Sequence, residues 1–325
     1  MEIPPEVIAA KNELERPLFA AGLITGMDFG VRDEEHPDPE DLVLRIFVAD
    51  ANFIAPEILA AIQFFPFPAV VIQRVFKTTG LPDKSPHRPV VGGSSMASSR
   101  FFTADATVHA GTLGAIVTDT LTPNIRYGLS NFHVMCVDSN RASGDPMVQP
   151  EPGPLGILAG TQIGTLRDWS FPETSEEGFV DAAICTLTEA SQLEVLEIGA
   201  VSGMVPPKVA MQVRKRGRTT GLTFGWISGI EGSFSLDFPN MPAVTASDGT
   251  LTTRRTFINQ IQIHADFPQS IVFGDHGDSG SVVVDFNNQV VGLYWGSGSF
   301  SDGDPLSFGL VNPAAAVENA LGIKF

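Results

Sequence analysis

Three side chains in the sequence could together perform acyl transfer: a serine, a histidine and an aspartate. Ser279 lies in residues 274–281, GDHGDSGS, directly before an apolar run. Glycines on both sides of it allow a sharp turn that brings backbone N–H groups close to a substrate carbonyl. A serine hydroxyl is a weak nucleophile until a base takes its proton. The turn therefore predicts a nucleophile only if a histidine and a carboxylate reach it.

His133 is the best candidate for the base among the six histidines. It follows an apolar strand and a small polar pair in residues 129–134, LSNFHV, where a short helical turn is expected. His276 lies three residues before Ser279 on the same turn and would need an awkward chain reversal to act on it. The others lie in proline-rich loops or strand-like runs and are interpreted as solvated or structural: His36, His87, His109 and His264.

The carboxylate that orients such a base is buried and held by a strand. Asp181 is embedded in an apolar run, FVDAAI, at residues 179–184. Burying an unpaired carboxylate is unfavourable, so Asp181 should have a partner. A structural alternative is that Asp181 caps a turn at the start of its strand. Asp138 and Asp168 are weaker candidates because each lies in a polar, loop-like context.

These three motifs, in this order, resemble those of the trypsin/chymotrypsin-like serine peptidases. SNFHV resembles the family's histidine motif, DAAI its aspartate strand, and GDSGS its nucleophile turn. The order His, Asp, Ser differs from the orders in subtilisins and α/β-hydrolases. The resemblance covers residues 90–325. It implies a triad of His133, Asp181 and Ser279, with an oxyanion hole formed by the N–H groups of Gly277 and Ser279.

Two further segments fit the same resemblance. Residues 213–223, VRKRGRTTGLT, look like the opening of the second barrel in bacterial trypsin-like proteins. Residues 290–296, VVGLYWG, resemble the strand that lines the substrate cleft, which would place Trp295 and Gly296 beside the substrate. The base of the primary pocket falls at Phe273. Because Phe273 is no carboxylate, an apolar or small substrate side chain is expected rather than lysine or arginine.

Asp278 resembles the aspartate that precedes the family's serine and that pairs, in some members, with a new N-terminus after zymogen cleavage. The chain shows no familiar activation sequence, so stabilisation of the turn is the simpler role for Asp278. The layout of the whole chain also resembles a bacterial group related to plant narrow-leaf proteins.

The fold expected from the sequence is mainly β, a chymotrypsin-like double β-barrel preceded by a small N-terminal α/β domain. Thirty-two glycines and 24 prolines suit many short strands joined by turns. Residues 1–89 form the α/β domain and a linker, with a first helix that Pro17 should stop. Residues 90–325 form the two barrels and a C-terminal helix, which Asn312 could cap and in which Pro313 suits the first turn.

The charge composition disfavours two classes of binding partner. A net charge of −17 and a pI near 4.6 disfavour nucleic acid and anionic membrane surfaces. We expect a cytoplasmic protein, because neither a signal peptide nor a membrane-spanning run is visible. Cys136 and Cys185 are expected to be small buried hydrophobic residues. We expect no cofactor and no metal site, since the spacing of Asp275, His276 and Asp278 matches no standard ligand pattern.

The function predicted from these residues is that of a serine endopeptidase acting on protein or peptide substrates. Three alternatives remain open at this stage. The chain could be an inactive peptide-binding module that uses the same cleft, an acyl hydrolase that acts on esters, or a latent effector whose cleft the N-terminal unit blocks until a regulatory signal arrives.

Overall fold

Strands dominate the computed structural model, as the sequence predicts. The structure describes residues 3–34, 37–50, 54–74, 83–100, 110–152, 160–266, 269–270, 272–300 and 307–325. His36 and His109 lie outside the described residues.

An antiparallel barrel carries the histidine and the aspartate. Its strands are β5 (Ser94–Ser98), β6 (Ala110–Leu113), β7 (Ala115–Asp119), β8 (Arg126–Ser130), β9 (Pro146–Gln149), β10 (Thr161–Ser170) and β12 (Ala182–Thr186). They pair in the order β7-β8-β12-β10-β9-β5-β6. Only Gly114 separates β6 from β7, so the order returns to its starting point and the barrel closes. The short helix α3 (Phe132–Met135) follows β8 directly.

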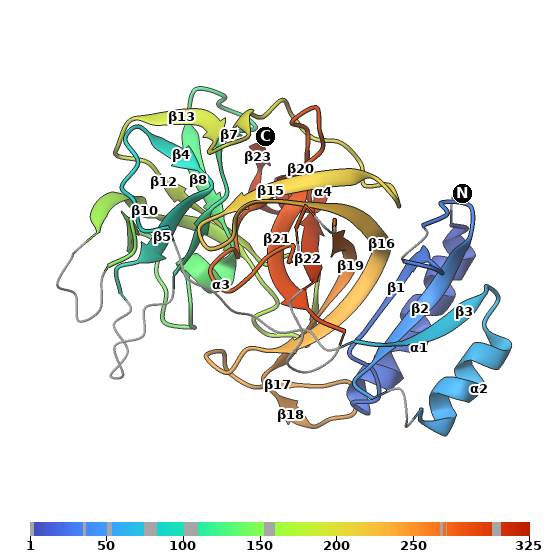
Figure 1. The fold of residues 1–325 in the computed structure, drawn as a ribbon. Coiled ribbons are helices and arrows are strands. Elements are labelled where there is room, and N and C mark those ends of the chain that lie inside the picture. Colours follow the sequence, from blue (N-terminus) through green and yellow to red (C-terminus); the bar gives the residue numbers. More distant parts are fainter. Residues whose placement is uncertain are drawn as a thin grey trace.

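A second barrel carries the nucleophile turn. Its strands are β15 (Gln212–Gly217), β16 (Gly221–Asp237), β19 (Arg254–Ala265), β20 (Val282–Val284), β21 (Val290–Gly298) and β22 (Phe308–Pro313). They pair in the order β19-β22-β21-β20-β15-β16, and β16 pairs again with β19 to close the ring. Figure 1 shows this barrel, in yellow to red, beside the first one in teal and green. The double barrel expected from the sequence is therefore confirmed.

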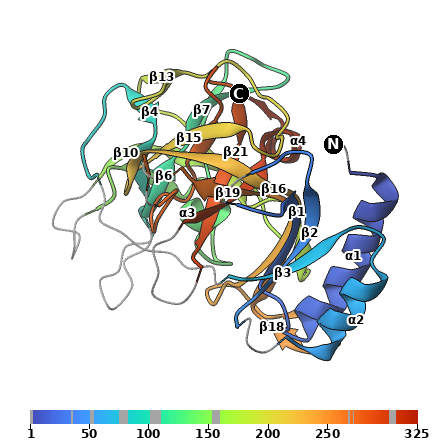
Figure 2. The same ribbon diagram turned by 45° about the vertical axis from the view of Figure 1, so that its right-hand side comes forward.

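The N-terminal unit extends the sheet of the second barrel. It comprises α1 (Pro5–Ala20), β1 (Gly26–Val31), β2 (Leu42–Val48), α2 (Pro56–Phe64) and β3 (Ala69–Gln73). β1 pairs with β16 and β2 with β1, both antiparallel, and β3 adds parallel to β2. Figure 2 shows both helices on the outer side of these strands, away from the barrels. The apolar cluster between helices and strands includes Phe19, Phe29, Leu44 and Ile58.

Two expectations about helix ends were wrong. α1 continues through Pro17 to Ala20, because Leu18 and Phe19 are buried and their packing holds the last turn in place. The C-terminal helix α4 (Ala314–Leu321) has Pro313 at its cap position and no side-chain cap. Asn312 belongs instead to β22, where its side chain has another role, described below.

Small strands complete the described chain. They are β4 (Val90–Gly92), β11 (Glu177–Gly178), β13 (Ser191–Val195), β14 (Gly199–Ala200), β17 (Val244–Thr245), β18 (Leu251–Thr252) and β23 (Ile323–Lys324). β23 pairs with β7, which joins the C-terminal end of the chain to the first barrel. In the described part of the chain, no helix has the length and apolar character needed to cross a membrane.

Candidate active site

The structure brings His133 and Asp181 together. His133 lies on α3, and its Nδ1 donates a hydrogen bond to Asp181 Oδ2 at 2.5 Å. The His133 backbone N–H donates to the other carboxylate oxygen, Oδ1, at 3.2 Å. The Asp181 side chain is fully buried, whereas 28% of the His133 side chain is exposed. One buried carboxylate therefore fixes both the ring and the backbone of the histidine, and leaves Nε2 as the nitrogen available to a substrate or nucleophile.

Two asparagines hold the backbone of Asp181. Asn131 Nδ2 donates to the Asp181 carbonyl at 2.6 Å. Asn312 Oδ1 accepts from Asp181 N–H at 3.1 Å, and its Nδ2 donates to the Asp181 carbonyl at 3.2 Å. Asn312 Nδ2 also donates to Leu293 O, at 3.2 Å, in β21. Asn312 thus ties the aspartate of the first barrel to the second barrel, a role that sequence reasoning missed.

Strand β6 places the nucleophile turn against the first barrel. Thr112 N–H donates to Ser279 O at 2.8 Å, and Thr112 Oγ1 donates to Gly277 O at 2.8 Å. A Cβ added at Gly111 would lie 2.4 Å from the Val134 side chain and 2.8 Å from Ser279 O. Because Gly111 has no side chain, Val134, which follows His133, and the backbone of Ser279 can both pack close to it. Among the described residues, the Ser279 hydroxyl makes no hydrogen bond, including none to the His133 ring.

Two backbone N–H groups of the nucleophile turn, one on each side of Asp278, have no partner among the described residues. Neither Gly277 N–H nor Ser279 N–H donates to another described residue. The carbonyl of Asp278 accepts from Ser281 N–H at 3.0 Å and from Ser281 Oγ at 2.5 Å. Because C=O and N–H point in opposite directions in a trans peptide, these bonds direct Ser279 N–H away from Ser281. Two backbone N–H donors without a partner are what an oxyanion hole requires.

The side chain of Asp278 anchors the nucleophile turn to the second barrel. It is fully buried, and its Oδ2 accepts from Lys215 Nζ at 3.0 Å. It also accepts from the backbone N–H groups of Thr219, at 2.8 Å, and Thr220, at 3.1 Å. Burial lowers the pKa of Lys215, and the charge of Asp278 opposes that shift. The internal ammonium of Lys215 therefore supports the turn, in line with the stabilising role expected for Asp278.

Three cations of the basic run that begins in β15 form ion pairs within the protein: Lys215, Arg216 and Arg218. Arg216 pairs with Asp83 at 2.7 Å and with Glu197 at 3.1 Å. Arg218 pairs with Glu151, and both side chains are largely buried. With Lys215 paired as described above, these cations form internal contacts of the protein. They are not arranged as an exposed basic patch.

Next to the nucleophile turn, one edge of β21 has no strand partner among the described residues. β20 pairs with β21 only as far as Leu293, and Gly280 N–H then donates to Tyr294 O at 2.9 Å. Beyond Tyr294, no described residue pairs with this edge, while β22 continues along the other one to Gly298. A strand edge without a partner is the kind of element with which an extended peptide can pair, although all residues of β21 are buried in this structure.

Of the three residues predicted to contact the substrate, Trp295 and Gly296 lie in β21, and Phe273 directly precedes the nucleophile turn. Gly296 is in the strand itself, and Trp295 is only 3% exposed, with its Nε1 donating to Gln260 Oε1 at 2.9 Å. Phe273 is fully buried. A Cβ added at Gly309 would lie 2.6 Å from the Phe273 ring, so that ring fills the space beside β22.

The other candidates lie elsewhere. Asp138 accepts from Arg100 at 2.8 Å, and Asp168 accepts from the adjacent Trp169 N–H at 2.8 Å. His264 stacks on Trp226. Burial lowers the pKa of His276, the charge of Asp275 opposes that shift, and the charge of His133 adds to it. The ring that bonds to Asp181 is that of His133. Within the described ranges, no group of three or more acidic, histidine or cysteine residues is arranged to hold a metal ion.

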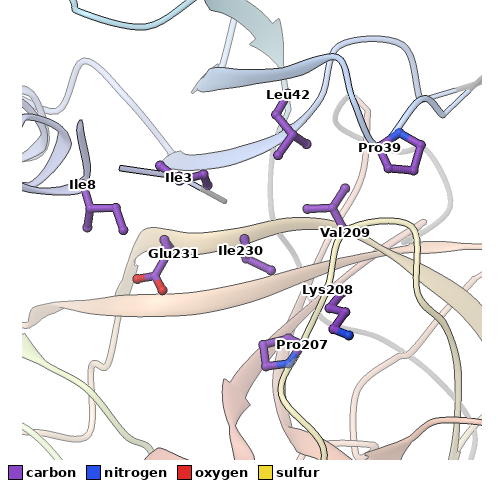
Figure 3. A pocket seen from close by; sticks show the side chains of 9 residues that line it. All are labelled: Ile3, Ile8, Pro39, Leu42, Pro207, Lys208, Val209, Ile230 and Glu231. Atoms are coloured by element: carbon purple, nitrogen blue, oxygen red, sulfur yellow. The ribbon is translucent and has the colours of Figure 1, made fainter. Parts of the chain in front are cut away.

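A separate cavity of about 670 Å³ lies between the N-terminal unit and β16 (Figure 3). Lys208 and Glu231 are its charged lining residues. The remaining lining residues are apolar: Ile3, Ile8, Pro39, Leu42, Pro207, Val209 and Ile230. None of the triad residues lines it.

Comparison with known proteins finds similarity in solved structures alone, since no family model and no curated protein matches the chain. A glutamic acid-specific serine protease is 18% identical, with a TM-score of 0.47 and coverage of 72% of this chain and 99% of that one. The Nocardiopsis protease NAPase is 16% identical, with a TM-score of 0.47 and coverage of 72% and 97%. The Cellulomonas bogoriensis chymotrypsin is 18% identical, with a TM-score of 0.43 and coverage of 73% and 97%.

The names of these proteins agree with the resemblance to trypsin/chymotrypsin-like serine peptidases that the sequence motifs carry. The identities are below 20% and the TM-scores below 0.5. The two barrels and the site therefore rest on this chain's own strand pairing and side chains.

Proposed function

We propose that the chain is a serine endopeptidase with Ser279 as nucleophile, His133 as general base and Asp181 as the residue that orients the base. The hydrogen bond between His133 Nδ1 and the fully buried Asp181 carboxylate carries the proposal. The nucleophile turn supports the proposal, because the N–H groups of Gly277 and Ser279 have no hydrogen-bond partner among the described residues.

In the proposed reaction, Ser279 Oγ attacks the substrate carbonyl carbon while His133 Nε2 takes the hydroxyl proton. The N–H groups of Gly277 and Ser279 stabilise the oxyanion that forms. Collapse of the tetrahedral intermediate breaks the C–N bond, and His133 returns the proton to the leaving amine. Water then hydrolyses the acyl-enzyme by the same steps, and Asp181 stabilises the imidazolium throughout.

The edge of β21 that has no strand partner among the described residues favours an extended peptide over a small ester as substrate. Residues 296–298 pair with β22 on one edge and have no strand partner among the described residues on the other. They are buried in this structure, so pairing with a substrate strand requires this edge to become accessible. If Phe273 forms the base of the primary pocket, its ring fills that pocket beside Gly309. We therefore propose that the residue on the N-terminal side of the cleaved bond has a small side chain, such as alanine or valine.

A fluorophosphonate probe tests the nucleophile. We expect it to label the wild-type protein at Ser279 and to leave Ser279→Ala unlabelled, whereas Ser202→Ala, a surface control, should label like wild type. Mapping of new N-termini in a protein mixture should then show small residues before the cleaved bonds. Labelling of Ser279→Ala, or cleavage after large aromatic residues, would contradict these assignments.

A latent enzyme is the second candidate, because Ser279 Oγ makes no hydrogen bond to the His133 ring in this structure. Labelling of untreated wild type would exclude latency. Labelling that appears only after limited proteolysis within residues 1–89 would instead identify a latent form that the N-terminal unit holds closed. Absence of labelling under both conditions would exclude an active serine enzyme.

A further inference from the structure

The peptide bond between His276 and Gly277 carries one N–H donor of the proposed oxyanion site. Gly277 has a φ of +90°, in the region that glycine adopts without strain. Without a Cβ, Gly277 does not itself restrict rotation of the peptide on its N-terminal side. Since the Gly277 N–H belongs to that peptide, its rotation would remove a donor from the site.

Thr219 holds that peptide. Its Oγ1 donates to the His276 carbonyl at 2.5 Å. Because C=O and N–H of a trans peptide point in opposite directions, fixing the carbonyl toward Thr219 fixes Gly277 N–H away from it. Thr112 holds the following peptide in the same manner, through the 2.8 Å bond from its Oγ1 to Gly277 O. A threonine hydroxyl on each side thus sets both peptide planes that meet at Gly277.

The position of Thr219 is itself fixed. Its backbone N–H donates to Asp278 Oδ1 at 2.8 Å, and Asp278 is anchored by Lys215. Arg218 lies beside it, so that a Cβ at Gly277 would be 2.4 Å from Arg218 Nη1 and 2.8 Å from Thr219 Oγ1. Arg218 and Thr219 therefore both lie close to Gly277, and the threonine hydroxyl donates a hydrogen bond to the His276–Gly277 peptide.

We propose that Thr219 is a positioning residue that keeps Gly277 N–H directed into the oxyanion site. The inference rests on the proposed peptidase function. Thr219 touches no reacting atom and acts through the His276–Gly277 peptide, so its loss should weaken transition-state binding and leave substrate binding unchanged.

Thr219→Val removes the hydroxyl and keeps the shape, and Thr219→Ser keeps the hydroxyl. Because a typical hydrogen bond contributes modestly, we expect Thr219→Val to lower kcat about three- to tenfold at unchanged KM. The Ki of a peptide aldehyde, whose adduct places an oxygen in the site, should rise by the same factor. Thr219→Ser should restore both values to within about twofold of wild type.

Thr25→Val is the matched control, since Thr25 Oγ1 also donates to a backbone carbonyl, that of Arg74, at 2.8 Å in the N-terminal unit. It should change neither kcat nor Ki. Wild-type kcat and Ki in folded Thr219→Val, or equal losses in the serine and valine variants, would overturn the proposal. Thr219→Ala serves in place of the valine variant if that protein does not fold.

Failure of the proposed function gives a different result. The wild-type protein would then neither react with the fluorophosphonate nor hydrolyse peptides. In that case crystal structures of wild type and Thr219→Val decide the positioning role. A rotated His276–Gly277 peptide in the variant supports the role, and an unchanged peptide overturns it.

Discussion

The hydrogen bonds of Asp181 both stabilise its buried carboxylate and orient the His133 ring. The two carboxylate oxygens of Asp181 accept from the ring and the backbone of His133, and its own backbone is held by Asn131 and Asn312. A buried charge without such partners would be strongly unfavourable. The contacts that satisfy Asp181 are therefore also the contacts that set the tautomer and direction of the His133 ring.

Asp181→Asn should lower kcat by a factor on the order of 10⁴, because an amide can hold the histidine in the wrong tautomer while keeping the geometry. Hydrolysis of a chromogenic peptide measures the effect. Asp168→Asn is the control, since Asp168 bonds only to its neighbour's backbone and should leave kcat unchanged. An Asp181→Asn enzyme within tenfold of wild type would remove Asp181 from the mechanism.

At the scale of elements, the nucleophile turn depends on strand β15. Lys215 enters the barrel from that strand, and its Nζ bonds to Thr220 Oγ1 at 2.8 Å as well as to Asp278. Both partners of the ion pair are fully buried. The ammonium that supports the turn is thus part of the folded chain and does not depend on cleavage elsewhere.

Lys215→Met should therefore destabilise the protein by about 3–5 kcal/mol, because it leaves the Asp278 carboxylate buried without its cation. Fluorophosphonate labelling of Ser279 should be lost with it. Denaturant unfolding measures the first effect, and Lys208→Met, at an exposed lysine, is the control. A Lys215→Met protein with wild-type stability and labelling would show that the turn forms without this ion pair.

Local motifs were predictable from the sequence, whereas long-range contacts were not. The residues around His133, Asp181 and Ser279 stand in short patterns whose chemistry is local. Asn312 was interpreted as a helix cap because it precedes Pro313, yet it bonds to Asp181, which lies 131 positions earlier in the chain. No feature of the sequence next to Asn312 marks such a contact.

The longest strand, β16, illustrates the same limit. Glycine is typical of turns, and the motif identified in this part of the sequence ends at Thr223, so most of β16 was not predicted. In the fold the glycines of β16 allow other groups to approach: a Cβ at Gly225 would lie 2.6 Å from His264 O, and one at Gly229 would lie 1.9 Å from an Asp28 carboxylate oxygen. The close neighbours of these glycines come from β19 and from the N-terminal unit, which a reading of local pattern cannot supply.

At the scale of the whole molecule, a buried polar seam joins the N-terminal unit to the second barrel. Arg45 of β2 donates to Asp28 of β1 at 2.7 and 2.6 Å, and both side chains are fully buried. Arg45 Nη2 also donates to Gln262 Oε1 of β19 at 3.1 Å. Burial raises the pKa of Asp28, and Arg45 opposes that shift. Separating the unit from the barrel would break the Arg45–Gln262 bond and expose the edge of β16 that pairs with β1.

Arg45→Met should consequently affect the active site as well as the N-terminal unit. We expect a loss of about 3–5 kcal/mol, because Asp28 is left buried and unpaired. Thermal unfolding should remain a single transition at a lower temperature, and Ser279 should stop reacting with the fluorophosphonate at that same temperature. Arg32→Met is the matched control: its ion pair with Asp41 is exposed, with 46% and 48% of the side chains accessible, so its loss should cost about 0–1 kcal/mol. If the N-terminal unit instead folds independently, Arg45→Met will produce an early transition of its own, and labelling of Ser279 will survive to the wild-type temperature.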